Sequence, residues 1–165
     1  MAIIIGQAQC CICEQEITEH EAWTATWGVP FAPPHPLYPF CDAPLHFSCL
    51  SGWSHREEYS QGYFQLFRSG HESGMGHLLG EGKRWFLGCG PCIQGQRPRY
   101  AQVVLAHWPI RLKMNDWHRW DRFLANDFQD GLSGPCLADA KAVMEEVRKI
   151  AGDQKALNAL HDAQG

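Results

Sequence analysis

The sequence predicts an α+β fold in which a short cysteine-rich module is elaborated with a small antiparallel sheet and C-terminal helices. Three observations indicate this class: two cysteine motifs in the first third of the chain, two apolar strand-like segments in the middle, and two apolar helical stripes near the end. The chain has 165 residues, 45% of them hydrophobic, which is enough for one core or a core with a small satellite. We expect one compact domain, with the cysteine-rich region at residues 1–95 and a strand plus two or three helices packed on it at residues 96–165.

The first half of the chain predicts few long elements. A short strand is expected at Ile3–Gln9. Residues 29–44 are so rich in proline that neither a helix interior nor a central strand can form there. A helix is expected over Phe47–Phe67, because apolar residues recur near helical spacing. A mobile loop is expected over residues 69–82, which contain five glycines.

The second half predicts two strands followed by two helices. The strands are expected within residues 83–92 and 99–112, the second with enough apolar residues to be buried. Asn115 is expected to cap one helix, and the last helix follows Pro135. Each helix has an apolar stripe, formed by Trp117, Trp120, Leu124 and Phe128 on the first and by Leu137, Ala140, Met144, Val147 and Ile150 on the last.

The net charge of -4 is unevenly distributed along the chain. Residues 1–60 carry seven acidic side chains against Arg56 alone, whereas residues 83–122 carry eight basic side chains against two acidic ones. The basic part could meet nucleic acid or an acidic protein, but the negative charge of the whole chain disfavours nucleic acid. The run Ile3–Ile5 is too short for a membrane span or the core of a signal peptide, so we expect a cytoplasmic protein.

The cysteine motifs predict a zinc site. Cys10 and Cys13 have the spacing of a zinc knuckle, in which a tight turn directs two thiolates at one metal. His46 and Cys49 lie three residues apart at the start of the predicted helix and therefore face the same way. Three thiolates and one imidazole fill a tetrahedral zinc site completely, which is typical of a structural ion, and a knuckle combined with a helix start is the treble-clef arrangement. In the alternative interpretation the cysteines are small buried apolar residues. Cys11 has no role in the quartet.

These motifs resemble the RING fingers, a treble-clef family. The segment Cys10-Cys11-Ile12-Cys13 resembles the family's C-x-[IL]-C element, and Cys89-Gly90-Pro91-Cys92 resembles its closing pair. The residues that match the central element are Cys41, His46, Cys49, Leu50 and Trp53. In that family, the positions matching Ile12 and Trp53 form part of a shallow apolar groove that docks a ubiquitin-conjugating enzyme. The resemblance therefore implies that Ile12, Leu50 and Trp53 bind a protein partner.

The resemblance also implies a second zinc site, formed by Cys41, Cys89 and Cys92. Ala43 stands where the family has the histidine that completes this site. The remaining candidates for the fourth ligand are Asp42, His71, His77 and a water. We therefore expect one structural zinc, and a second only if one of these substitutes joins the three cysteines.

Two functions remain open on this basis. The first is a RING-like ubiquitin-ligase adaptor, which holds a charged conjugating enzyme in a productive conformation and forms no covalent intermediate of its own. The second is a non-enzymatic binding protein, such as a bacterial immunity protein that covers the active site of a toxin with an acidic or aromatic surface. Residues 35–64 are also similar to small bacterial treble-clef proteins, some of which look like toxin-neutralising partners.

Overall fold

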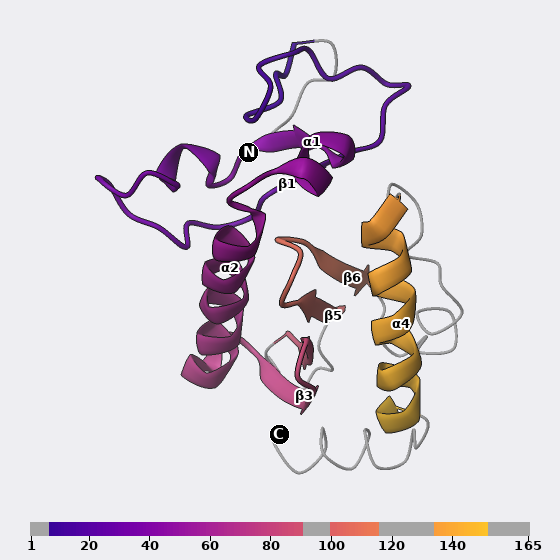
Figure 1. The fold of residues 1–165 in the computed structure, drawn as a ribbon. Helices are drawn as coiled ribbons and strands as arrows, with labels where there is room; N and C mark the ends of the chain where they lie inside the picture. Colours follow the sequence, from indigo (N-terminus) through magenta and orange to yellow (C-terminus); the bar gives the residue numbers. More distant parts are fainter. Residues whose placement is uncertain (1–6, 91–99, 116–133, 152–165) are drawn as a thin grey trace.

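The structure is a computed structural model that describes residues 7–90, 100–115 and 134–151 (Figure 1). Within these residues the fold is mixed α and β, with two small antiparallel sheets and three helices. The first sheet pairs β1 (Trp23–Ala25) with β2 (Pro44–His46), and α1 (Phe47–Gly52) follows β2 directly. The predicted combination of helices and antiparallel strands is thus confirmed.

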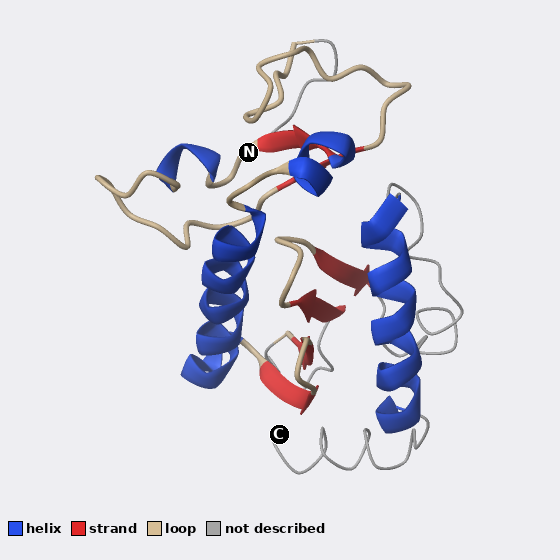
Figure 2. Ribbon diagram, in the orientation of Figure 1, coloured by secondary structure: helices blue, strands red, loops and turns tan. Residues whose placement is uncertain are grey.

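The second sheet has four strands in the order β3-β4-β5-β6, and each neighbouring pair is antiparallel. Its strands are β3 (His77–Glu81), β4 (Trp85–Cys89), β5 (Tyr100–Leu105) and β6 (Arg111–Asn115). The longer helices α2 (Arg56–Gly70) and α4 (Gly134–Ala151) lie on opposite sides of this sheet (Figures 1 and 2). This part of the molecule therefore has three layers.

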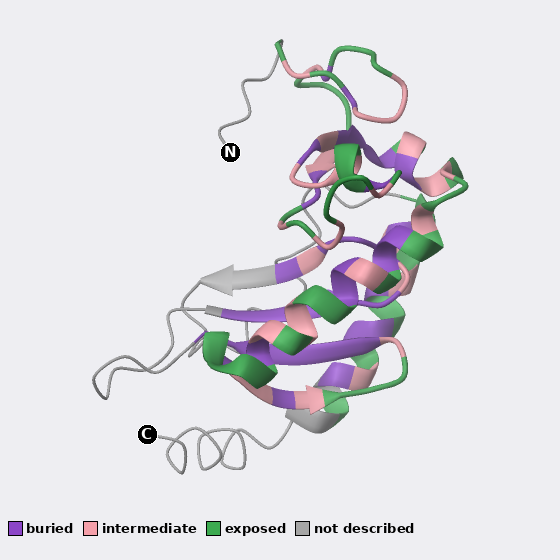
Figure 3. Cartoon of the chain, turned by 90° about the vertical axis from the view of Figure 1, so that its left-hand side faces the viewer, coloured by how far each residue is buried: buried purple, intermediate pink, exposed green. Residues whose placement is uncertain are grey.

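Successive side chains of a strand point to opposite faces, and this alternation divides the core between the two helices. On one face, Phe86 and Val104 pack in an apolar cluster with Tyr59, Tyr63 and Phe64 of α2. Residues of the opposite face join a second cluster that includes α4: Trp85, Leu87 and Val103 from the sheet and Ala140, Val143 and Met144 from the helix. The middle strands are consequently buried from both sides, as the purple segments of Figure 3 show.

Polar contacts fix α4 on the sheet. The Trp85 indole N–H donates to Glu146 Oε2 at 2.7 Å, and Arg84 forms ion pairs with Asp139 at 2.7 Å and with Glu146 at 3.5 Å. The predicted stripe of this helix is confirmed at Ala140, Met144 and Val147, which are buried. The helix predicted after Asn115 and the side chain of Ile150 lie outside the described residues.

The single helix predicted over Phe47–Phe67 is wrong, because two helices occupy this stretch. α1 ends at Gly52, Trp53 takes an extended conformation (φ -72°, ψ 123°), and α2 begins at Arg56. The break places the Trp53 ring against Phe40 and Tyr59, with ring centroids 4.7 and 5.5 Å away. Aromatic packing with the preceding segment thus outweighs continuation of the helix.

The mobile loop predicted over residues 69–82 is also wrong. α2 continues to Gly70, a π-helical turn η2 (His71–Met75) follows, and His77–Glu81 form β3. The glycines serve this structure: Gly74 has a left-handed φ of 93°, and a Cβ on Gly76 would collide with the Cys89 carbonyl oxygen. The irregular character predicted for residues 29–44 is confirmed, apart from the 3₁₀ turn η1 (Tyr38–Phe40) and Pro44, with which β2 begins.

The strand predicted at Ile3–Gln9 falls mostly outside the described residues, and Gln9 forms one isolated bridge with Glu16. No described helix combines the length and the apolar character that a membrane-spanning segment requires.

Candidate metal centre

The first two ligands come from a tight turn that begins at Cys10. The Cys10 N–H donates to Gln15 O and the Glu14 N–H donates to Cys10 O, both at 2.8 Å. Glu14 closes the turn with a left-handed φ of 62°. The turn folds Cys10 and Cys13 toward the same point, which is the geometry expected of a knuckle.

The β1–β2 hairpin and α1 supply the other two ligands. His46 ends β2, pairs with Trp23 across the hairpin and serves as the N-cap residue of α1. Cys49 follows in the first turn of the helix, three residues later, so both side chains face the knuckle. The Cys11 N–H donates to Pro44 O at 2.9 Å and ties the knuckle to β2.

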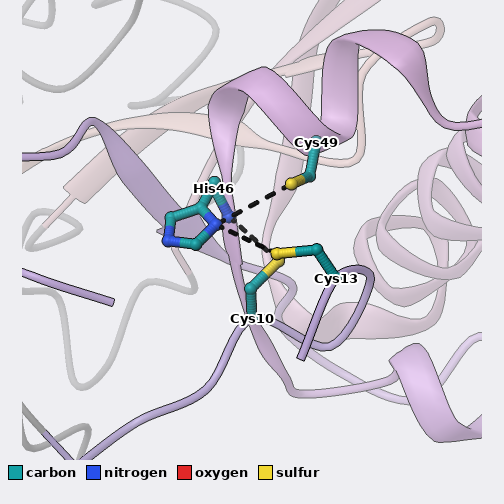
Figure 4. Close-up of side chains that lie close together, drawn as sticks. All are labelled: Cys10, Cys13, His46 and Cys49. Atoms are coloured by element: carbon teal, nitrogen blue, oxygen red, sulfur yellow. Dashed lines mark hydrogen bonds between the residues drawn. The ribbon is translucent and has the colours of Figure 1, made fainter. Parts of the chain in front are cut away.

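Cys10, Cys13, His46 and Cys49 converge so that their ligand atoms all lie within 4.8 Å of one another (Figure 4). His46 Nδ1 is 3.5 Å from Cys13 Sγ and 3.7 Å from Cys49 Sγ. A tetrahedral zinc ion, with bonds of about 2.3 Å to sulfur and about 2.05 Å to nitrogen, holds such a sulfur–nitrogen pair about 3.6 Å apart. The observed distances match this value, so the quartet can hold a metal ion such as zinc.

The thiols of this centre differ in acidity. Burial raises the pKa of the Cys10 thiol, but hydrogen bonds from the backbone N–H groups of Cys13, His46 and Ile12 outweigh it and lower that pKa to about 7. Burial and the neighbouring Cys13 and Cys10 thiols raise the pKa of Cys49 to about 12. Crowded thiols therefore cannot all ionise unless a cation lies between them, and a divalent ion supplies that charge.

Cys11 stays outside the quartet. Its side chain is half-buried, and burial together with the charge of Cys10 raises its pKa to about 12. Geometry excludes it as a ligand, because its sulfur is not among the four ligand atoms that lie within 4.8 Å of one another.

Glu21 belongs to the surroundings of the centre, and the sequence analysis missed it. Its carboxylate oxygen Oε2 lies 3.5 Å from His46 Nε2, the ring nitrogen that faces away from the sulfurs. Hydrogen bonds from the Thr18 hydroxyl and N–H lower the pKa of the Glu21 carboxyl. The spacing Thr18-x-x-Glu21 is that of a capping box, and this signal could have identified the pair.

The structure does not assemble the predicted second site from the residues it describes. Cys41 directs its thiol at the carbonyl oxygens of Phe31 and Leu37, at 3.7 and 3.8 Å. Cys89 is buried in the cluster that includes α4, whereas Cys41 packs against the cluster that includes α2. Cys92 lies outside the described residues, so the second site stays a prediction.

Neither histidine considered for that site serves as a ligand among the described residues. His71, the C-cap residue of α2, is buried and hydrogen-bonds through Nδ1 to Phe67 O at 2.8 Å. Its Nε2 faces the Gln102 amide nitrogen at 3.3 Å, and the Gln102 amide oxygen accepts from Arg111. Burial lowers the pKa of His71, so the ring is a neutral core histidine. The structure places His77 in no metal-binding group of described residues.

The predicted partner-binding residues differ in accessibility. Ile12 and Trp53 are half-buried, and both pack against the cluster that includes α4. Leu50 is fully buried in that cluster. Leu50 could therefore act on a partner only indirectly, by fixing the position of Trp53 three residues later.

Comparisons of the chain with protein-family models, with curated proteins and with solved structures found no match. What the protein does is therefore inferred from its own residues, and first of all from the Cys10, Cys13, His46 and Cys49 quartet.

Proposed function

We propose that the chain is a zinc-stabilised protein-interaction module of the treble-clef type. The observation that carries this proposal is the convergence of three thiols and one imidazole within 4.8 Å. Four protein ligands leave no coordination position for a water or substrate, so the ion has a structural role. The site needs its cysteines reduced and deprotonated to bind the metal, so the proposal includes a reducing compartment such as the cytoplasm.

The metal proposal is tested by comparing two neighbouring half-buried cysteines of the knuckle. Cys13→Ser removes a ligand, whereas Cys11→Ser changes a thiol that the quartet does not use. We expect the Cys11→Ser protein to keep one equivalent of zinc and the Cys13→Ser protein to lose it or to be insoluble. Zinc-free, folded wild-type protein would overturn the proposal.

Within this class we propose a RING-like adaptor that docks a ubiquitin-conjugating-type enzyme. Ile12 lies inside the knuckle and Trp53 lies four residues after Cys49, at the spacing of the RING groove. Both side chains are half-buried and therefore keep surface for a partner. The adaptor would act by positioning the charged enzyme, without a covalent step.

The docking proposal is tested by stimulated release of ubiquitin from a panel of charged conjugating enzymes. Ile12→Ala and Trp53→Ala are expected to abolish the stimulation while zinc content stays at the wild-type level. Trp27, which is 43% exposed, provides a matched control, and Trp27→Ala should retain activity. Wild-type protein with a full complement of zinc and no stimulation of any enzyme in the panel would overturn this function.

The toxin-neutralising function is a second candidate, favoured by the acidic surface around the metal centre. Residues 7–55 contain no lysine or arginine, and Glu14, Glu16 and Glu19 are exposed. Such a surface suits a basic protein partner. A salt-sensitive complex with a basic toxin that is weakened by Glu14→Lys and Glu16→Lys, and unaffected by Ile12→Ala, would favour this function over the adaptor.

A further inference from the structure

We infer that Glu21 is a positioning residue for the metal centre, and that its carboxylate holds the His46 imidazole with Nδ1 directed at the metal. The inference rests on the proposed zinc site. Its starting point is the orientation of His46, whose Nδ1 lies between the Cys13 and Cys49 sulfurs while Nε2 points to the other side.

Metal binding at Nδ1 determines the protonation of the rest of the ring. A neutral imidazole that gives its Nδ1 lone pair to a metal carries its proton on Nε2. His46 is only 5% exposed, and its Nε2 makes no hydrogen bond that meets ordinary distance and angle limits. A buried N–H group without an acceptor destabilises the structure, so this nitrogen needs a partner when the metal is bound.

Glu21 is placed to be that partner. Its Oε2 lies 3.5 Å from Nε2. A charge-assisted hydrogen bond is about 2.8 Å long, so a movement of about 0.7 Å closes the contact. The Glu21 side chain is about half exposed, which leaves room for this adjustment.

The turn that carries Glu21 directs the carboxylate toward the histidine. The same oxygen accepts from the Thr18 hydroxyl at 2.9 Å and from the Thr18 N–H at 3.2 Å. The Glu21 N–H returns a bond to Thr18 O at 3.4 Å. The carboxylate is therefore held by two groups of one residue before the metal binds, and the result is a relay from Thr18 through Glu21 and His46 to the centre.

An open cavity of about 360 Å³ borders this pair, and its lining includes Ser48 and Ser51. The Ser51 hydroxyl already donates to Phe47 O at 2.9 Å. Water in this cavity can replace a missing carboxylate only in part, because it carries no charge and is not held by the Thr18 turn. Loss of Glu21 should therefore weaken the metal site without abolishing it.

The test uses the full-length protein and its zinc affinity, measured by competition with a chromophoric chelator. Mutation of a carboxylate that hydrogen-bonds a metal-ligating histidine typically weakens metal affinity by about 10–100-fold. We expect Glu21→Gln to weaken zinc binding by about 10-fold and Glu21→Ala by up to about 100-fold, with Glu21→Asp in between wild type and Gln. Glu19→Gln is the matched control, because Glu19 is exposed and its carboxylate pairs with the exposed His20, so the zinc affinity of this variant should change less than about twofold.

A second measurement separates positioning from a merely structural role of the turn. In zinc-loaded wild-type protein, the His46 Nε2 proton should be visible by NMR and protected from exchange with water. In Glu21→Gln that proton should exchange faster, while the ring stays bound to zinc through Nδ1. Zinc-binding wild-type protein in which Glu21→Gln and Glu19→Gln match in affinity and in proton exchange would overturn the inference. Wild-type protein that binds no zinc would instead overturn the proposed metal site.

Discussion

The region before α2, residues 7–55, and the layered region that begins with α2 are built in different ways. Residues 7–55 form two strands of three residues, one helix of six residues and long irregular segments. The layered region contains helices of 15 and 18 residues and a sheet of four paired strands. Isolated helices much shorter than about 12 residues are unstable in water, so the first region cannot rely on its own secondary structure.

The first region nevertheless joins the core of the second. Ile17, Leu45, Phe47 and Leu50 belong to the same apolar cluster as the α4 side of the sheet. The two regions therefore share apolar packing, but among the residues that the structure describes only the first region has a converging set of candidate metal ligands. This difference indicates that a metal centre can stabilise a short segment that has little regular secondary structure.

The largest expected effect is the loss of zinc. A structural zinc site contributes on the order of 10 kcal/mol at neutral pH, which is comparable to the stability of a whole domain. Chelation should therefore remove amide-exchange protection from the knuckle, β1, β2 and α1, while amides of β4 and β5 retain part of theirs. Equal loss of protection in both regions would contradict the proposed division between them.

A second prediction concerns the close packing of the layered region at Gly88. A Cβ at Gly88 would lie 2.5 Å from the His71 ring, whereas a Cβ at Gly52 in α1 would meet nothing within 4 Å. Gly88→Ala should cost about 1–3 kcal/mol in the free energy of unfolding. Gly52→Ala should change it by less than about 1 kcal/mol. Urea denaturation of both variants measures the contrast, and equal effects would show that the His71 side of the sheet is not closely packed.

The pH dependence of stability should include a contribution from His71. Burial lowers the pKa of this ring in the folded protein, and His77 and Arg111 add to the effect. The unfolded chain then binds the proton more readily, so stability is complete above about pH 6.5 and falls as the pH drops below that value. Zinc-loaded His71→Gln should lose less stability between pH 7 and pH 5 than wild type in urea titrations.

The control for this prediction is the exposed His55, which lies 3.6 Å from Glu58. Its replacement by Gln should leave the wild-type pH profile nearly unchanged. Because all three proteins share the acid-sensitive metal ligands, only the difference between their profiles is interpreted. A His71→Gln profile identical to that of wild type would contradict the assignment.

The smallest expected effect concerns the ion pair between Arg84, the residue before β4, and Asp139 of α4. Arg84 and Asp139 lie 2.7 Å apart, with side chains 35% and 20% exposed. Pairs this accessible contribute about 0–1 kcal/mol, and salt screens them. Asp139→Asn should therefore lower stability by no more than this in low salt and by less in 1 M salt. A loss of several kcal/mol would show that α4 depends on this pair more than on its apolar contacts.

The sequence predicted the ligand set better than the elements that carry it. Cys10 and Cys13 were recognisable because ligand chemistry requires a fixed local spacing, and His46 and Cys49 for the same reason. The break at Trp53 could not be predicted, because it depends on aromatic contacts with Phe40, which is 13 positions earlier in the chain. The strand His77–Glu81 was not recognised because glycines flank it, and the close contacts of Gly76 and Gly82 with Cys89 and Trp85 of β4 exist only in the folded protein.

The role of Glu21 was missed for a related reason. Its motif with Thr18 is local, but its relation to His46 exists only after the β1–β2 hairpin has formed. Periodicity and spacing describe neighbours along the chain, whereas an outer partner of a ligand is defined by the tertiary fold.

X-ray absorption spectroscopy at the zinc edge of the purified full-length protein tests the metal centre most directly. The proposed quartet predicts one zinc per chain, surrounded by three sulfur atoms at about 2.3 Å and one nitrogen at about 2.0–2.1 Å. A spectrum dominated by oxygen ligands, or a folded protein without zinc, would contradict it.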